Sequence, residues 1–155
     1  MPTRWVAGHH FTPLGLAPSP DLFLAALAPA TQRIRLGSLV HLLPLYTPVR
    51  LIEEVCMLAQ LSGGRLELGI GRGVSPFELG HYGVDFLGSR EGFEETLTAL
   101  IAGLTQPQLH ATGQQFRYRG APWSCARCSS PCRRCGTALP ARAVCISPPS
   151  AACMG

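Results

Sequence analysis

Three side chains suited to chemistry follow directly after short apolar runs of the sequence. His9 and His10 follow one such run, and Arg72 follows another, between Gly71 and Gly73. An imidazole exchanges a proton near neutral pH, and a guanidinium beside glycine amides binds an anion. This combination predicts a pocket for a phosphorylated cofactor with a histidine nearby.

Each of these residues also has a purely structural interpretation. Neighbouring strand residues point to opposite faces, so at most one of the two adjacent histidines is expected to face a shared site. His41 lies inside another apolar run, which is more typical of a hydrogen-bonded core histidine, and Arg72 suits the surface as well as an anion site. The run Gly69–Gly73 begins like a GxGxxG fingerprint, but Val74 replaces the third glycine, so a Rossmann site is not favoured.

The cysteines offer a different chemistry. Six of the seven lie after residue 123, and four of them form two Cys-x-x-Cys pairs: Cys125, Cys128, Cys132 and Cys135. Four thiolates suit tetrahedral zinc, but zinc ribbons separate such pairs by about 15–20 residues, and here the gap is three. We therefore assign no metal ligands, and a small Cys-rich metal-binding protein stays as an alternative.

The elements that must position these residues follow from the apolar runs. Strands are predicted over residues 4–7, 34–43 and 65–70, and the second of these is apolar enough to be a parallel strand buried on both faces. Residues 71–88 are expected to be irregular. A weak alternation over residues 114–119 indicates a strand or a hairpin arm.

Three helices are predicted between and after these strands. The first begins at Pro20 behind the N-cap Ser19 and is ended or kinked by Pro29, the second begins at Pro48, and the third begins with the cap Ser89. The apolar faces expected to meet the core comprise Ile52, Val55, Cys56 and Ala59 in the second helix, and Phe93, Leu97, Leu100, Ile101 and Leu104 in the third.

The predicted order of strands and helices alternates, which is typical of parallel βαβ units. A doubly wound sheet and a (β/α)8 barrel share this order over a short stretch. In both folds functional groups gather beyond the carboxyl ends of the strands. The histidine pair, His41 and Arg72 all follow or end such strands.

Composition narrows the class of protein. Among 155 residues 46% are hydrophobic and 14% charged, which excludes a fully disordered chain. The net charge of +4 comes from residues 96–155, which contain six arginines and no Asp or Glu. No nucleic-acid-binding motif accompanies these arginines. No apolar run approaches the roughly 20 residues of a membrane span, and no signal peptide is visible. We expect a cytoplasmic protein that binds neither nucleic acid nor membrane.

Several segments between residues 4 and 122 share a pattern with one protein family. They comprise Trp5–Phe11, Arg33–Gly37, Leu43–Arg50, Glu53–Val55, Leu61–Arg65, Gly69–Gly73, Tyr82–Asp85 and Ser89–Arg90. In this order they resemble the luciferase-like family of flavin-dependent monooxygenases. No single motif carries the resemblance, so it is specific.

The resemblance implies an α/β fold, a partial (β/α)8 TIM barrel containing about strands two to four, over residues 1–122. It implies a flavin-dependent oxidoreductase that activates oxygen at reduced FMN, or uses F420 in some branches. The implied partners are the reduced flavin and a small organic substrate, with a homo- or heterodimer as a further possibility.

The same resemblance assigns roles to residues. His9 would lie near the reactive flavin carbon as a general acid or base. Arg72, with Gly71 and Gly73, would lie near the flavin phosphate. The Leu39-Val40 segment would support the isoalloxazine ring, at a point where the family often has a strained peptide.

The sequence also departs from the family. Gly8 replaces the usual Glu before the histidine pair, Ala59 replaces an Asp, and Pro29 interrupts a helix. Residues 123–155 are rich in Cys, Arg and Pro and are expected to form an unstructured tail. We therefore expect a truncated or frameshifted family member with impaired activity. A catalytically silent remnant that acts only through a partner is the alternative.

Overall fold

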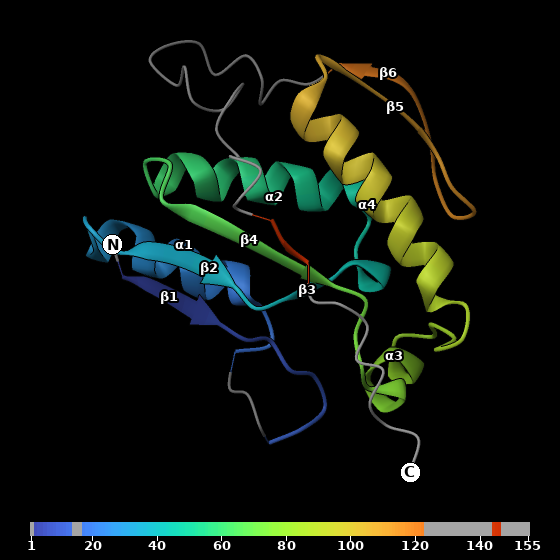
Figure 1. The fold of residues 1–155 in the computed structure, drawn as a ribbon, viewed down its shortest axis with the longest axis horizontal. Helices are drawn as coiled ribbons and strands as arrows, with labels where there is room; N and C mark the ends of the chain where they lie inside the picture. The colour runs from blue at the N-terminus through green and yellow to red at the C-terminus, as the bar shows by residue number, and fades with distance from the viewer. Residues whose placement is uncertain (1, 14–16, 123–143, 147–155) are drawn as a thin grey trace.

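A parallel sheet forms the centre of the molecule (Figure 1). The computed structural model describes residues 2–13, 17–122 and 144–146. The strands of this sheet are β1 (Thr3–Val6), β2 (Arg35–Ser38), β3 (His41–Leu42), β4 (Leu66–Gly71) and β7 (Val144–Ile146). β2 lies between β1 and β4, and β3 and β7 pair with opposite sides of β4, because Ile70 is a partner of both. All these pairings are parallel, as predicted.

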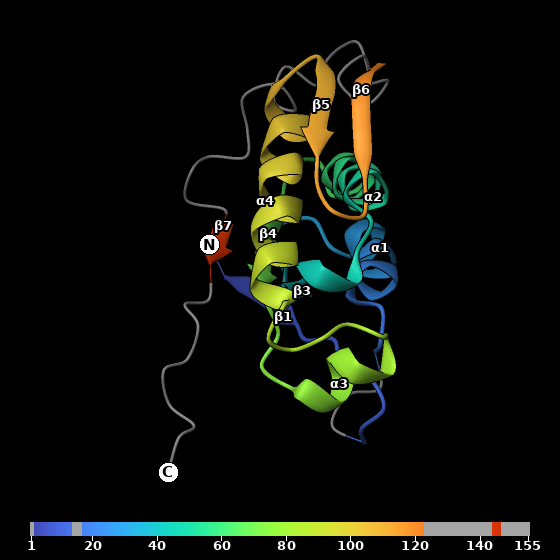
Figure 2. The ribbon, with the colours of Figure 1, turned by 90° about the vertical axis from the view of Figure 1, so that its right-hand side faces the viewer.

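Helices cover one face of this sheet, as Figure 2 shows. α1 (Pro20–Ala30) packs against β2, and α2 (Pro48–Leu61) packs against α1 and β4. α4 (Ser89–Thr105) packs against α2, and the antiparallel hairpin of β5 (Gln108–Thr112) and β6 (Arg117–Pro122) packs against α4. The carboxyl ends of the parallel strands therefore meet at one end of the sheet, near α3 (Pro76–His81) (Figure 1).

The strand predicted over residues 34–43 is divided into β2 and β3. The Ser38 hydroxyl donates to the Gly69 carbonyl and accepts from the Gly69 amide, both at 3.2 Å, so a side chain satisfies these groups of β4. A cis peptide bond joins Leu39 to Val40, and pairing with β4 resumes at His41. The prediction of a single long strand is therefore wrong. The interruption lies at Leu39-Val40, the segment that was expected to support a flavin.

The buried face of α2 differs from the predicted stripe. Its buried residues are Pro48, Leu51, Ile52, Val55 and Leu58, and Cys56 and Ala59 are half-buried. All four predicted residues therefore meet the core, but only Ile52 and Val55 are fully buried in it. α2 is covered by α1, the sheet and α4, so its apolar face is wider than one narrow stripe and turns towards Leu51 and Leu58.

α4 shows a similar correction. Its predicted face included Ile101, which is 52% exposed, whereas Thr96, Ala99, Leu100 and Gly103 are buried. Small residues let this helix approach its neighbours closely, and spacing among large apolar residues does not reveal them. The helix is also capped one residue earlier than predicted, at Gly88.

Four elements of the described residues were not predicted: the 3-10 helix η1 (Leu43–Leu45), β5, α3 and β7. α3 lies inside the stretch expected to be irregular, where Ser75 accepts from the amide of Glu78 at 3.2 Å as an N-cap. β7 lies inside the expected tail, and this corrects the expectation of no structure at its three residues. The two Cys-x-x-Cys pairs and the rest of residues 123–155 lie outside the described residues.

Candidate functional site

A cavity of about 170 Å³ lies at the carboxyl ends of the parallel strands. Its lining contains every residue that the sequence assigned to a site: His9, Leu39, Val40, Gly71, Arg72 and Gly73. It also contains Gly8, Leu42, Val74 and Glu78. Residues that follow β1, form the β2–β3 junction and follow or end β4 therefore meet at one place, although 70 positions separate Gly8 from Glu78 in the sequence.

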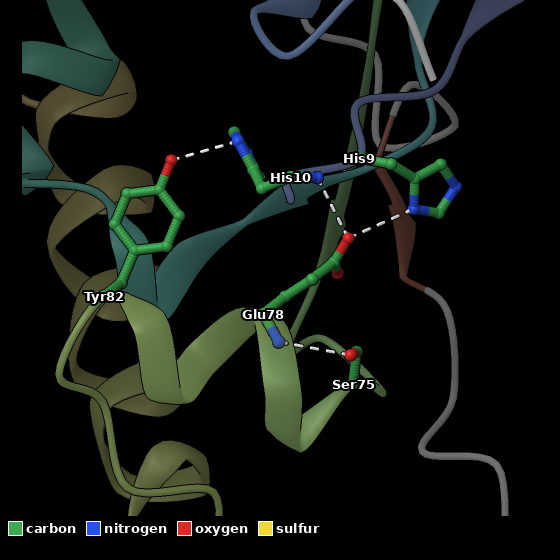
Figure 3. A network of polar contacts seen from close by, with 5 residues as sticks. All are labelled: His9, His10, Ser75, Glu78 and Tyr82. Atoms are coloured by element: carbon green, nitrogen blue, oxygen red, sulfur yellow. Dashed lines mark hydrogen bonds and ion pairs between the residues drawn. The ribbon is translucent and has the colours of Figure 1, made fainter. Parts of the chain in front are cut away.

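Glu78 orients the histidine pair, as Figure 3 shows. Its Oε1 atom lies 3.4 Å from His9 Nδ1 and accepts a hydrogen bond from the His10 backbone amide at 3.0 Å. Glu78 is buried, whereas the His9 side chain is 44% exposed. A carboxylate oxygen only accepts, so the proton of a neutral His9 ring resides on Nδ1 and Nε2 is its basic nitrogen. The pair therefore favours one tautomer of His9.

Sequence reasoning missed Glu78, although one signal for it was present. Ser75-Pro76-Phe77-Glu78 has the S-x-x-E spacing of a capping box, which predicts a helix start. In that motif the Glu side chain returns to the N-cap amide. Here it bonds to the histidine pair instead.

His10 does not line the cavity. Its Nδ1 lies in hydrogen-bond contact with the Tyr82 hydroxyl at 3.0 Å, and its ring meets the Tyr82 ring edge-on at 5.1 Å (Figure 3). At most one of the adjacent histidines was expected to face the site, and only His9 does, although neither lies in a strand because β1 ends at Val6.

Arg72 presents a buried donor without a partner. Its Nε is buried and has no hydrogen-bond partner among the described residues. Its guanidinium carbon lies 4.5 Å from the centroid of the Phe86 ring, which is a cation–π contact. A buried donor left unpaired costs about 1–3 kcal/mol, so this guanidinium is suited to an incoming anion.

Two glycines shape the wall opposite His9. A Cβ at Gly71 would lie 2.7 Å from Val40 Cγ2, so only glycine lets the Leu39-Val40 segment lie against β4. Gly73 has a φ of +94°, a left-handed conformation that disfavours residues with a Cβ. Leu39 is 45% exposed beside them. This wall combines an exposed apolar side chain with backbone that a planar group can approach.

His41 lies in the core, as its apolar surroundings predicted. It is 1% exposed, and its Nε2 lies 2.7 Å from Asp21 Oδ1. The nearby Tyr46 ring meets it edge-on at 5.4 Å, and burial, reinforced by Asp21, raises the pKa of the Tyr46 hydroxyl. Burial also raises the pKa of Glu54, and Asp21 adds to that rise.

A larger cavity of about 420 Å³ lies between the amino ends of α2 and α4 and the β5–β6 turn. Tyr46, Tyr82, Asp85, Glu95 and Phe116 are part of its lining. None of the sequence-assigned residues reaches it, so size alone does not identify the site. We therefore locate the candidate site by its chemistry, in the smaller cavity.

Metal binding receives no support from the described residues. No three of their His, Cys, Asp and Glu side chains are grouped as a metal site would require. Within the same residues no helix is long and apolar enough to cross a membrane.

Comparison with known proteins places the chain among monooxygenases. The chain is 45% identical over 117 residues to the y4wF protein of Sinorhizobium fredii, covering 76% of this chain and 34% of that protein. It is 34% identical over 116 residues to the alkanal monooxygenase alpha chain of Photorhabdus luminescens, covering 75% and 32%. The chain thus spans about a third of the length of the curated relatives it matches.

Solved structures support the same assignment. The monooxygenase RslO1 from Streptomyces bottropensis is similar with a TM-score of 0.72 and 30% identity, over 76% of this chain and 36% of that one. The oxygenating constituent of 3,6-diketocamphane monooxygenase from Pseudomonas putida, solved with FMN, shares the fold with a TM-score of 0.69 at 24% identity, over 82% and 36%. The predicted fold class, part of a (β/α)8 barrel, is confirmed.

The family model described as luciferase-like monooxygenase matches residues 3–142, which is most of the chain. That match includes β1 to β4 of the parallel sheet and the residues of the small cavity. The chain therefore belongs to the luciferase-like monooxygenase family.

Proposed function

We propose that the chain contributes the flavin-binding part of a flavin-dependent monooxygenase, with reduced FMN as cofactor and a small organic molecule as substrate. The observation that carries this proposal is the small cavity, which joins an oriented histidine, an arginine whose buried Nε has no hydrogen-bond partner among the described residues, and a glycine-lined wall. These three features suit, in turn, proton transfer, a phosphate and a planar ring.

The residues fit a phosphorylated flavin. Arg72 holds a buried Nε without a partner, and a phosphate would satisfy it with a charge-assisted hydrogen bond. The exposed Leu39 and the backbone beside Gly71 offer an apolar surface for a ring system. At about 170 Å³ the cavity is smaller than the roughly 300–1,000 Å³ typical of ligand pockets, so it would enclose one part of the cofactor.

His9 is the residue we assign to proton transfer. Glu78 accepts from Nδ1, which leaves Nε2 of the neutral ring to take up a proton and then return it. The bound flavin would supply the electrons for the reaction with oxygen, and the protein would orient it and exclude water. F420 is the alternative cofactor, because it also carries a phosphate for Arg72 to bind.

Flavin titration of the full chain tests this proposal. We expect the fluorescence of FMN to be quenched when it binds. The affinity for FMN should be at least about tenfold higher than that for riboflavin, because only FMN carries the phosphate that Arg72 would bind. Arg72→Met should remove this difference and leave riboflavin binding almost unchanged. F420 should be titrated in parallel to decide between the two cofactors.

Arg90→Met is the matched control. Arg90 is also an arginine on this face of the fold, but it is exposed and pairs with Glu94 outside the cavity. It should keep the preference for FMN. Equal affinities for FMN and riboflavin in the unmodified chain would reject the role of Arg72, and the absence of binding to FMN, riboflavin and F420 would reject the proposed function.

A further inference from the structure

The buried His41 side chain connects three elements at the carboxyl end of the sheet. It belongs to β3, its Nε2 contacts Asp21 in the first turn of α1 at 2.7 Å, and its Nδ1 lies 3.4 Å from the Gly69 carbonyl of β4. The His41 side chain is 1% exposed and that of Asp21 is 12% exposed. Water therefore does not compete for these contacts.

The contact with Asp21 is the shorter of the two. Nε2 and Oδ1 lie 2.7 Å apart, so a proton between them makes a short hydrogen bond, whereas Nδ1 lies 3.4 Å from the Gly69 carbonyl oxygen. A buried hydrogen bond to a carboxylate is stronger than a neutral surface bond.

His41 directly follows the segment that forms one wall of the small cavity. Val40 lines that cavity and lies against β4, where it would clash with any Cβ at Gly71. β2 ends at Ser38, and after it the Leu39 amide still donates to the Val6 carbonyl of β1 at 2.8 Å. Strand pairing with β4 resumes only at His41. The position of the wall on the β4 side therefore depends on the anchors Ser38 and His41 at its two ends.

We propose that His41 and Asp21 form a positioning pair that holds the Leu39-Val40 wall of the cavity against β4. Its consequence for flavin binding rests on the proposed function, whereas its consequence for the wall does not. Neither residue lines the cavity, so the pair acts through Val40 and not by touching a ligand.

Arg65 provides a natural comparison within the same fold. Its guanidinium donates to the Ala28 carbonyl of α1 at 2.8 Å and to the Ile34 carbonyl at 3.0 Å, so it also ties α1 to the sheet. It does so at the amino ends of the strands, far along the sheet from the cavity. A change at Arg65 should weaken the fold without acting on the wall.

Amide hydrogen exchange of the full chain without ligand tests the proposal. Asp21→Ala and His41→Asn should each speed exchange at residues 40–42 by about tenfold to a hundredfold relative to residues 66–68, because a charged hydrogen bond is lost locally. The double variant should be no faster than either single variant, because both break one contact. Arg65→Met should speed exchange around residues 34–36 and not at 40–42.

A second substitution of His41 distinguishes its contact with Asp21 from its contact with the Gly69 carbonyl. His41→Gln places an amide nitrogen near the former Nε2 and should retain more protection at residues 40–42 than His41→Asn. Uniform acceleration across the sheet in Asp21→Ala, or no acceleration, would overturn the positioning role.

FMN binding then extends the test to the proposed function. At a temperature where every variant is folded, Asp21→Ala and His41→Asn should raise the Kd for FMN about tenfold and alter the visible circular dichroism of bound FMN, whereas Arg65→Met should do neither. Faster amide exchange at residues 40–42 with an unchanged Kd for FMN would overturn the link between the wall and the cofactor. If the unmodified chain binds no FMN, the proposed function fails, and the exchange pattern alone decides the positioning role.

Discussion

Oε1 of Glu78 lies 3.4 Å from Nδ1 of His9, and the same oxygen accepts from the His10 amide. Two residues that are 69 positions apart thus form the polar centre of the cavity. Gly8, directly before the pair, has no side chain to orient it, and the carboxylate comes from a one-and-a-half-turn helix that begins at Pro76. The site therefore depends on α3 as much as on the strand ends.

Glu78→Leu should release the tautomer of His9. One oxygen of Glu78 faces both His9 Nδ1 and the His10 amide, and leucine has no acceptor there, so the ring proton is no longer held on Nδ1 and the form protonated at Nε2 should gain population. Glu78→Gln can keep an oxygen at this position and should retain the tautomer. Nitrogen NMR of the His9 ring in the unliganded chain measures this change. Turnover, where the assembled enzyme provides it, should fall about 10–100-fold, because a general base in the wrong tautomer cannot take up a proton.

Ser75→Ala is the companion variant for this prediction. It removes the cap of α3 and leaves the carboxylate in place, so it should lower stability by about 1 kcal/mol without releasing the tautomer. An unchanged His9 tautomer in Glu78→Leu would show that the carboxylate does not orient the ring.

Gly71→Ala should disturb the wall of the cavity through Val40. The added Cβ would lie 2.7 Å from Val40 Cγ2, closer than real contacts allow, so the wall must move. We expect a loss of about 1–3 kcal/mol in the free energy of unfolding, measured by urea denaturation, because the site is buried and becomes overpacked.

Val40→Ala combined with Gly71→Ala tests that mechanism. Removing the Val40 methyl groups should relieve the clash, so the double variant should be more stable than the sum of the two single losses predicts. Additive losses would show that the strain lies elsewhere.

The strand-end residues were predictable because their signals are local. An apolar run that stops at a histidine pair, or at Gly-Arg-Gly, predicts both the strand and the chemistry at its end. Glu78 was not predictable in this way, because its role depends on a contact between distant segments and on a helix of six residues. The same is true of Asp21, whose visible signal was only that of a helix start.

The division of the second strand shows a different limit. Apolar residues continue through Leu39 and Val40, so the pattern predicts one strand, whereas the Ser38 hydroxyl satisfies the Gly69 backbone and ends β2. Hydropathy does not distinguish a serine whose hydroxyl hydrogen-bonds to the neighbouring strand from a serine that makes no such bond. The buried faces of α2 and α4 deviate for a related reason, because helix neighbours and not spacing decide which residues are covered.

Arg65→Met should lower the free energy of unfolding more than the same substitution at an exposed arginine. The Arg65 guanidinium donates to Thr31, Ile34 and Ala28, and the loss of charged hydrogen bonds is expected to cost about 2–3 kcal/mol in urea denaturation. Arg90→Met is the surface comparison, because the Arg90–Glu94 pair is exposed and should contribute about 0.3–0.5 kcal/mol. Equal losses in the two variants would contradict the anchoring role of Arg65.

Glu54 should make the protein less stable as the pH rises through the range just above the ordinary pKa of Glu. Burial raises the pKa of Glu54, Asp21 adds to the rise, and Arg50 opposes it only in part. The folded chain then holds the Glu54 proton more tightly than the unfolded chain, so the free energy of unfolding falls as the pH increases through that range. Glu54→Gln cannot lose this proton and should escape the loss.

Urea denaturation between pH 4 and 7 measures the difference, which we expect to grow with pH in favour of Glu54→Gln. Glu53→Gln is the matched control, because Glu53 also lies 3.5 Å from Arg50 and its loss removes a similar exposed ion pair. If both variants follow the same pH dependence, the loss of the Arg50 contact explains it. If only Glu54→Gln departs from the unmodified chain, the raised pKa of Glu54 explains the pH dependence. Burial of Glu54 and its proximity to Asp21 are then the cause.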